Sequence, residues 1–214
     1  MMNIEWLGHA GFRIAGSRTV CIDPFQMQEG EKADLVLITH PHYDHCSPAD
    51  LKKIAGPETV IIAPIGCQSK IAAGRFHYAE FRNIQPGGKV SIYGAVISAV
   101  PAYNIGKKFH NRHDDWVGYV IELDGKRFYH AGDTDFINEM AGIKADVAFL
   151  PVGGTYTMDA REAAHAAAII RPKIAVPMHY GSIVGSADDA EKFEKSVAHS
   201  RVEIMQKGIP EELI

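Results

Sequence analysis

The chain has 214 residues, of which 46% are hydrophobic, and this size fits one domain, residues 1–214, with a sizeable core better than it fits two. Its formal charge of -4 comes with scattered Lys and Arg residues, which disfavours an extended nucleic-acid surface. No stretch approaches the roughly 20 apolar residues that cross a bilayer, and no basic and then apolar leader opens the sequence. We therefore expect a cytoplasmic protein without a membrane partner.

The cysteines support the same compartment. Cys21, Cys46 and Cys67 are odd in number and lack a paired spacing, which favours reduced thiols. Cys46 follows His45 directly, but the side chains of adjacent residues diverge, so we leave Cys46 out of any ligand set.

In chain order, alternating patterns predict short strands at 4–7, 12–14 and 19–22, and then an apolar strand at 34–39. A helix is expected to begin at Pro48, with Ser47 as its N-cap and Asp50 as the capping partner. Leu51, Ile54 and Ala55 form the apolar face of this helix. A strand at 60–63 and a helical segment at 67–73 follow.

The second half continues with a hairpin of 89–93 and 95–100 and a second hairpin of 117–123 and 126–130. Buried strands at 147–150 and 174–178 flank a helix that Asp159 caps together with Glu162. The inner stripe of this helix contains Ala163, Ala166, Ala167 and Ile170, and His165 lies on its opposite, solvent or interface side. A last helix starts at Ser186 and buries Ala190, Phe193 and Val197. The pattern alone predicts mixed α and β structure.

The segment after residue 38 is the strongest chemical signal. His40, His42, Asp44 and His45 place three imidazoles and a carboxylate within six residues, and such groups are ligands for zinc, manganese, iron or nickel. On extended backbone His40 and His42 point to one side and can share an ion. A turn at Tyr43 can bring Asp44 and His45 to a second ion. A histidine-rich surface turn is the alternative.

This His-x-His-x-Asp-His pattern resembles the first motif of the metallo-β-lactamase-fold hydrolases, and residues 130–134 (HAGDT) and 178–181 (MHYG) resemble its later motifs. The opening segments 6–12 and 22–25 resemble the branch that contains L-ascorbate-6-phosphate lactonase. The resemblance implies an α/β (α+β) fold, a four-layer αββα metallo-β-lactamase sandwich. It also implies two divalent metal ions, with zinc, manganese, nickel and iron all open as their identity.

By this resemblance His40 and His42 hold the first ion, Asp44, His45 and His179 hold the second, and Asp133 bridges them. Many relatives supply a further histidine after the strand at 95–102, where this chain has Tyr103 and Asn104. We choose His110 for this position, with His113 and Asn104 left open.

One regularity of the sequence supports a common site. His40, His130 with Asp133, and His179 all follow apolar strands, and open α/β layers place their ligand crevice at the carboxyl ends of strands. Gly132 allows a turn there, although residues 132–134 alone also fit an ordinary Asx turn.

Other residues have two readings. His9, between Gly8 and Gly11, is either a substrate or proton-transfer contact or a turn histidine. Asp23 can fix the tautomer of a ligand imidazole or cap a turn. His130 is expected to support the site rather than to bind metal. Tyr156 and Tyr180 are phenolic donors or core residues.

The expected activity is hydrolysis by a metal-bound hydroxide, with Asp44, Asp133 or His9 passing a proton. Lys107, Lys108 and Arg112, together with Tyr180, form the predicted substrate contacts, and these cations suit a small phosphorylated lactone or a phosphodiester. Hydrolysis of a carboxylic ester, amide or β-lactam is the alternative reaction, and a non-catalytic metal-binding or sensor protein is the alternative class. The partner is thus a small-molecule substrate. The sequence leaves open whether copies of the chain form a homo-oligomer.

Overall fold

The computed structural model describes residues 2–28 and 30–214. Residue contacts divide the chain into two compact units. Unit 1 comprises Met1–Gln85 and Gln206–Ile214, and unit 2 comprises Pro86–Met205. The expectation of one domain over residues 1–214 stays a prediction.

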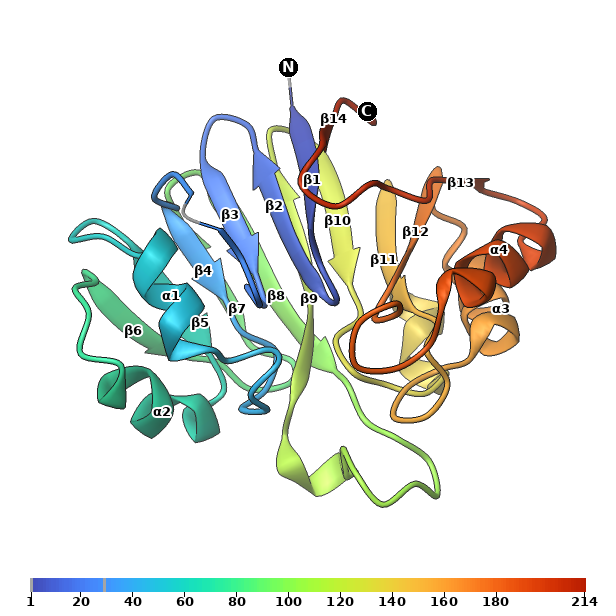
Figure 1. Cartoon of the computed structure of the whole chain (residues 1–214), viewed down its shortest axis with the longest axis horizontal. Helices are drawn as coiled ribbons and strands as arrows, with labels where there is room; N and C mark the ends of the chain where they lie inside the picture. The colour runs from blue at the N-terminus through green and yellow to red at the C-terminus, as the bar shows by residue number, and fades with distance from the viewer. Residues whose placement is uncertain (1, 29) are drawn as a thin grey trace. The chain divides into compact units, whose positions relative to one another are not determined.

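Unit 1 contains a mixed sheet in the order β14-β1-β2-β3-β4-β5-β6, as far as the described residues go. Its antiparallel part runs through β14, β1, β2 and β3, and its parallel part runs through β3, β4, β5 and β6. The strands are β1 (Asn3–Gly8), β2 (Gly11–Ala15), β3 (Thr19–Ile22), β4 (Leu35–Leu37), β5 (Val60–Ala63), β6 (Glu80–Asn83) and β14 (Pro210–Glu211). In Figure 1 these strands run from blue to green, with β14 in red.

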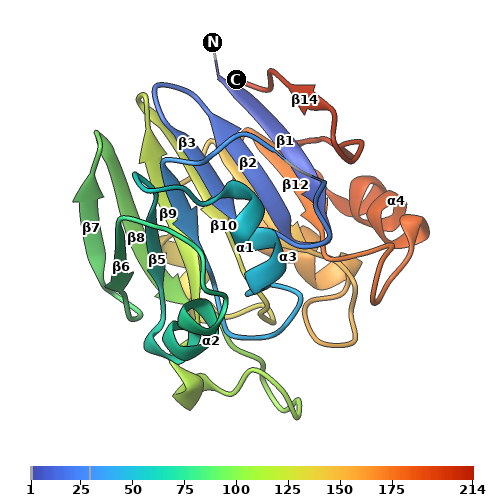
Figure 2. The same cartoon turned by 60° about the vertical axis from the view of Figure 1, so that its left-hand side comes forward.

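Two helices of unit 1, α1 (Pro48–Ile54) and α2 (Gln68–Ala73), cover the parallel part of its sheet (Figure 2). A short 3-10 turn, η1 (Ile65–Cys67), leads into α2. Leu51 and Ile54 of α1 and Ile71 of α2 pack in one buried cluster with strand residues such as Val36 and Ile61. Strands buried on both faces are expected to be continuously apolar, as β4 and β5 are.

Unit 2 contains the second mixed sheet, in the order β13-β12-β11-β10-β9-β8-β7. Strands β7 to β10 pair antiparallel, and β10 to β13 pair parallel. The strands are β7 (Lys89–Ile92), β8 (Ala95–Pro101), β9 (Val117–Leu123), β10 (Lys126–His130), β11 (Val147–Pro151), β12 (Ile174–Met178) and β13 (Arg201–Val202). Both predicted hairpins are confirmed, because Ile92 pairs with Ala95 and Leu123 with Lys126.

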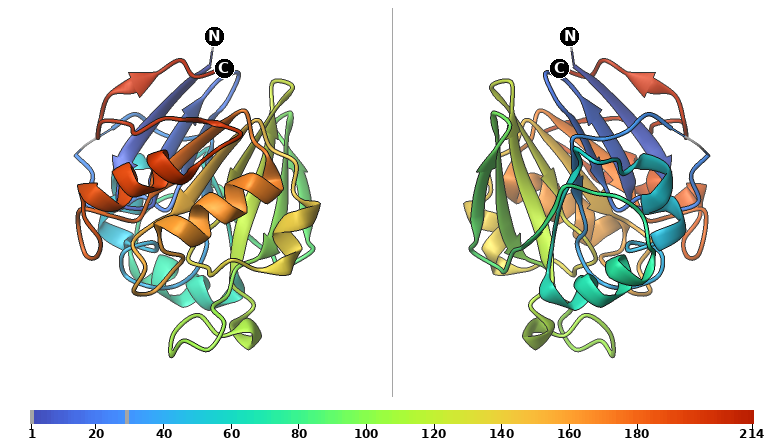
Figure 3. Two further views of the ribbon diagram at one scale, coloured as in Figure 1. Left: turned by 90° about the vertical axis from the view of Figure 1, so that its right-hand side faces the viewer. Right: turned by 90° about the vertical axis from the view of Figure 1, so that its left-hand side faces the viewer.

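Helices α3 (Ala160–Ile170) and α4 (Ala187–Ser196) lie side by side against the parallel part of the unit 2 sheet (Figure 3, left). Two 3-10 turns, η2 (Arg112–Asp114) and η3 (Asn138–Gly142), complete the unit. The predicted capping box of Asp159 and Glu162 is present, and so is the buried alanine stripe. His165 is exposed, as expected, and its ring contacts that of Phe136. The prediction that Val197 is buried in the last helix is wrong, because α4 ends at Ser196 and Val197, its half-buried C-cap, turns into extended backbone.

Strands that run in the same direction end at the same edge of a sheet. In each unit this brings the candidate site residues to one edge. In unit 1 the ends of β1, β3 and β4 lead into His9, Asp23 and the turn that begins at Thr39. In unit 2 the ends of β10 and β12 lead into the turn with Asp133 and into His179.

Three strands were not predicted from the sequence. β6, β13 and β14 are short and carry little alternation, and their pairing with distant segments defines them. Among the described residues, no helix combines the length and the apolar character that crossing a bilayer requires.

The predicted start of α1 is confirmed, and its cap also anchors the preceding loop. The Asp50 carboxylate accepts hydrogen bonds from Ser47 Oγ (2.7 Å), from Lys53 Nζ (2.9 Å) and from the N–H groups of Gln26 and Met27 (3.0 Å each). Burial opposes ionisation of this group, but these donors together hold the pKa of Asp50 below its usual value. Asp50 therefore joins α1 to the loop that follows Asp23.

We expect Asp50→Ala to lower the free energy of unfolding at neutral pH by about 1.5–3 kcal/mol, the usual range for hydrogen bonds to a charged group. Because the folded-state pKa is depressed, this contribution is present above the unfolded-state pKa and is lost as the pH falls through the folded-state pKa. Urea unfolding of wild type and variant between about pH 7 and pH 3 measures it. The difference should shrink toward low pH. Asp188→Ala, an exposed position on α4, is the control, and equal losses in both variants would contradict the assignment.

Candidate metal centre

The ligand turn of unit 1 (residues 39–47) leaves β4 and folds back on itself. The N–H groups of His45 and Cys46 both donate to the carbonyl of His42 (3.2 and 2.8 Å), which closes the turn. His40 Nε2 and His42 Nδ1 lie 3.1 Å apart. Two imidazoles on one tetrahedral zinc ion, each about 2.0–2.1 Å from it, have nitrogens about 3.3 Å apart. The distance between these two nitrogens is therefore close to the spacing of two ligands on one ion, although the backbone bends at residues 41 and 42 and does not stay extended.

Asp23 is buried at the base of this turn, and its hydrogen bonds determine which ring nitrogen carries the proton in two histidines. His45 Nδ1 donates to Asp23 Oδ2 (2.7 Å), so the other nitrogen of His45, Nε2, carries the lone pair. Thr39 donates to the same carboxylate through its N–H (2.8 Å) and its hydroxyl (2.5 Å). Since that hydroxyl uses its one O–H to donate a hydrogen bond to Asp23, it accepts from His40 Nδ1 (2.9 Å), and Nε2 of His40 is left as an electron-pair donor. Asp23 thus contacts an imidazole directly, the arrangement that the first of its two sequence interpretations requires.

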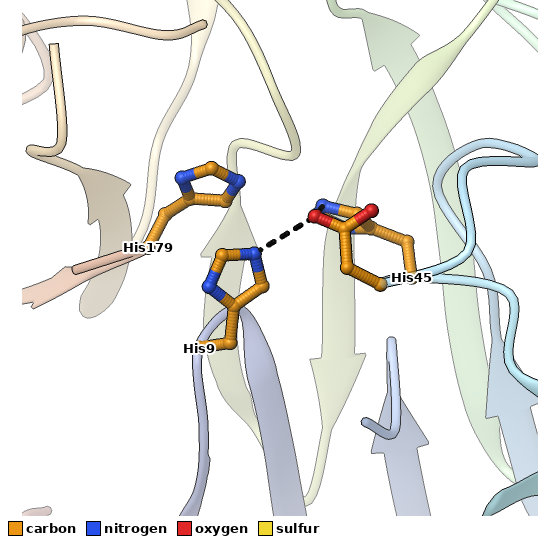
Figure 4. A group of neighbouring side chains, drawn as sticks. His9, His45 and His179 are labelled. Carbon is orange, nitrogen blue, oxygen red and sulfur yellow. Dashed lines mark hydrogen bonds and ion pairs between the residues drawn. The ribbon is translucent and has the colours of Figure 1, made fainter. Parts of the chain in front are cut away.

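His9, Asp44 and His45 form a compact cluster at the same edge. His9 Nε2 lies 3.0 Å from Asp44 Oδ2, a hydrogen bond that Figure 4 marks with its dashed line, and His45 Nε2 lies 3.6 Å from the same oxygen. The three ligand atoms are all within 4.8 Å of one another, and all three residues are buried. Neutral imidazole nitrogen and carboxylate oxygen are donors that zinc and its neighbours accept. The residues of unit 1 thus fit a divalent cation.

A second cluster lies in unit 2 around Asp133. Its Oδ2 is 3.1 Å from His179 Nε2 and 3.3 Å from His110 Nε2, and the three side chains are nearly fully buried. Gly132 has φ +65°, which provides the predicted turn before Asp133. A Cβ on Gly153 would come within 2.4 Å of the His179 carbonyl oxygen, so only glycine lets that backbone approach. His110, Asp133 and His179 therefore converge as predicted.

His113 and Asn104, the alternatives to His110, have different surroundings. His113 is exposed in η2. Asn104 is buried, and its Nδ2 donates to the carbonyls of Tyr156 (2.6 Å) and Phe109 (3.1 Å) and lies 3.2 Å from His110 Nδ1. Asn104 thus supports the loop that carries His110. His130 accepts from the N–H of Gly132 through Nδ1 (3.2 Å), which agrees with its expected supporting role.

The predicted substrate contacts have different surroundings. Lys107 Nζ lies on three protein oxygens, and Arg112 donates to Glu139 (3.1 Å) while its guanidinium lies over the ring of Tyr103. Lys108 is exposed beside the Phe109 ring. Tyr180 is buried, and burial raises its pKa, so its hydroxyl stays protonated at neutral pH.

Two residues of the site were missed in the sequence. Thr39 could have been identified from the sequence, because a hydroxyl directly before a candidate ligand histidine can reach the ring of that histidine. Asp135 follows Asp133 by two residues, but its partners Ile105 and Lys107 lie about thirty residues away, so no local pattern identified it.

Comparison with known proteins identifies the family. A family model described as a β-lactamase superfamily domain matches residues 3–179. UPF0173 metal-dependent hydrolases from Pyrococcus abyssi (34% identical, 97% of this chain and 98% of the relative) and Thermococcus onnurineus (36% identical, 97% of each) are similar over nearly their whole lengths.

Solved structures agree with this result. A protein from Parabacteroides distasonis matches with a TM-score of 0.81 at 32% identity, over 96% of this chain and 94% of that one. A metallo hydrolase from Ignicoccus hospitalis matches with a TM-score of 0.79 at 26% identity, over 100% and 99% of the two chains. The two mixed sheets with flanking helices match the α/β sandwich fold of the superfamily, which confirms the predicted fold class. The chain therefore belongs to the UPF0173 metal-dependent hydrolase family of the β-lactamase superfamily, and it is an enzyme of that class.

Proposed function

We propose that this hydrolase uses two divalent cations and acts on a small phosphorylated lactone or a phosphodiester. In this assignment His40, His42 and His110 would hold one cation, Asp44, His45 and His179 would hold the other, and Asp133 would serve both. The observation that carries the proposal is the Asp23 network, because it leaves Nε2 of both His40 and His45 as electron-pair donors. Imidazole and carboxylate donors accept zinc, manganese, nickel or iron.

A divalent cation held by these residues would lower the pKa of a coordinated water into the neutral range and would so supply a nucleophile. The protein's own groups manage the protons. His9 Nε2 holds a proton against Asp44 Oδ2, and it can release that proton to the oxygen of a leaving group. Tyr180 keeps its phenolic proton and is available as a donor to a developing negative charge.

Lys108 supports the phosphorylated substrate class. Lys107 and Arg112 each have a carboxylate partner, although Arg112 is exposed, whereas Lys108 is exposed and lies beside the Phe109 ring. An exposed ammonium can bind a phosphate as a point charge. The likeness to the lactonase branch adds the lactone to this proposal.

We also place the enzyme in the cytoplasm. Cys21, Cys46 and Cys67 are all free and buried, which suits a reducing compartment.

Replacing the bridging residue tests the metal assignment. We expect Asp133→Ala to lower both bound metal and hydrolysis of bis(p-nitrophenyl) phosphate by more than about 100-fold, a larger loss than removal of an outer partner causes. Metal content by mass spectrometry after dialysis and the steady-state rate are the measurements. Asp188→Ala on α4 should change neither. An Asp133→Ala variant that keeps its metal and its turnover would rule the assignment out.

Replacing the hydroxyl that supports His40 tests the network. Thr39→Val should weaken metal binding by about 10–100-fold, because the Nδ1 proton of His40 loses its acceptor. Thr39→Ser keeps the hydroxyl and should bind metal nearly as wild type does. Titration with zinc against a chromophoric chelator gives both affinities, and equal affinities for the two variants would count against the network.

Replacing Lys108 tests the substrate class. Lys108→Ala should raise KM about tenfold or more for a phosphorylated lactone, since a charge-assisted hydrogen bond contributes about 1.5–3 kcal/mol. KM for the same lactone without phosphate should not change. Lys89→Ala, an exposed lysine on β7, is the matched control. An enzyme that hydrolyses the unphosphorylated lactone as well as the phosphorylated one would refute this substrate class.

A further inference from the structure

The loop between β8 and β9 (residues 102–116) carries His110 and is closed on itself. The N–H of Asn104 donates to the carbonyl of His110 (2.7 Å), which joins the two sides of the loop. The rings of Phe109 and Tyr156 meet edge to face at 5.4 Å and attach the loop to residues 153–158. His110 itself has φ +60°, a left-handed conformation that residues other than glycine keep only where their surroundings impose it.

A clamp formed by Lys107, Asp135 and the carbonyls of Gly154 and Thr157 holds this loop. Lys107 Nζ donates to Asp135 Oδ1 (2.5 Å), to Thr157 O (2.7 Å) and, at longer range, to Gly154 O (3.4 Å). An ammonium has three N–H donors, and three protein oxygens surround this one. The Lys107 side chain is 29% exposed and that of Asp135 is 7% exposed. The clamp therefore occupies the N–H donors of Lys107 that a substrate phosphate would need.

Asp135 connects the clamp to the turn that carries Asp133. Its second oxygen, Oδ2, accepts from the N–H of Ile105 (2.8 Å), and its own N–H donates to Tyr103 O (3.0 Å). One oxygen of Asp135 thus holds the loop through Lys107, and the other holds it through the backbone. Asp135 lies two residues after Asp133, so both oxygens of its carboxylate connect the loop of residues 102–116 to the turn that carries Asp133.

The geometry at His110 depends on this fixation. Its Nε2 lies 3.3 Å from Asp133 Oδ2, the separation of two ligands on one ion, and both residues are nearly fully buried. The partly buried ion pair between Lys107 and Asp135 adds little net stability, because the desolvation of both charges offsets their attraction. Its effect is on geometry, since it determines where the loop of residues 102–116 lies relative to the turn that carries Asp133.

We propose that Lys107 and Asp135 are positioning residues that set His110 against Asp133 for a shared cation, and that Lys107 does not bind substrate. This inference rests on the proposed function for the assignment of His110 and Asp133 as ligands. The clamp predicts that metal affinity depends on Lys107, whereas the neighbouring Lys108 does not affect it.

Cobalt(II) binding to the full chain tests this proposal through affinity and visible absorption. Lys107→Met should weaken binding of one cobalt ion by about 10–100-fold and alter the absorption bands, as removal of a supporting partner does. Lys108→Met is the matched control and should bind cobalt as wild type does. The double variant Lys107→Met with Asp135→Asn leaves no unpaired buried charge, so it should fold even if the single variant does not, and it should still bind cobalt weakly.

Amide hydrogen exchange without metal tests independently whether the clamp holds the loop of residues 102–116. The N–H groups of Asn104 and Ile105 should be protected in wild type and in Lys108→Met and should exchange faster in both Lys107 variants. Wild-type affinity and spectrum in the folded Lys107 variants, with only a lower melting temperature, would overturn the positioning role. A wild type that binds no cobalt would refute the proposed function, and unchanged exchange in the variants would still refute the clamp.

Discussion

The buried carboxylate of Asp23 is the constraint on which the candidate metal cluster of unit 1 depends. It receives hydrogen bonds from the N–H of Thr39, from the Thr39 hydroxyl and from His45, all in a fully buried position. Each donor is thereby oriented, and the histidines are left with their Nε2 atoms as electron-pair donors. Because Asp23 directly follows β3 and the histidines follow β4, the parallel pairing of these two strands brings the anion to its partners.

Four residues of the two candidate clusters carry backbone strain. His9, Asp23, His110 and His179 all have φ between +43° and +60°, a region that residues other than glycine rarely adopt. Strained conformations persist where the surroundings over-determine them, and they concentrate at functional sites. In both units the strained residues lie beyond the ends of strands, where the ladder hydrogen bonds stop and side chains must hold the backbone.

The basic loop shows how neighbouring like charges take separate roles. Lys107, Lys108 and Arg112 look alike in the sequence, but their surroundings differ. Lys107 is on a buried carboxylate and carbonyl oxygens, Arg112 lies between Glu139 and the Tyr103 ring, and Lys108 is exposed. Lys107 is surrounded by protein oxygens, whereas Lys108 and Arg112 are both exposed, so cations of one loop differ in the donors that they have left for a ligand.

The sequence by itself determined most of the helices and strands and the residue types of the candidate metal ligands. The cap at Ser47, the hairpin turns and the spacing of His40, His42, Asp44 and His45 are local features, and local hydrogen bonding and side-chain period explain why they could be predicted. Tertiary structure alone decided which groups support them. Lys107 meets partners 28 and 50 residues away, and Asn104 reaches a carbonyl 52 residues away. Such contacts depend on how strands pair and loops close, and no periodicity in the chain records which distant carboxylate or carbonyl a side chain will meet.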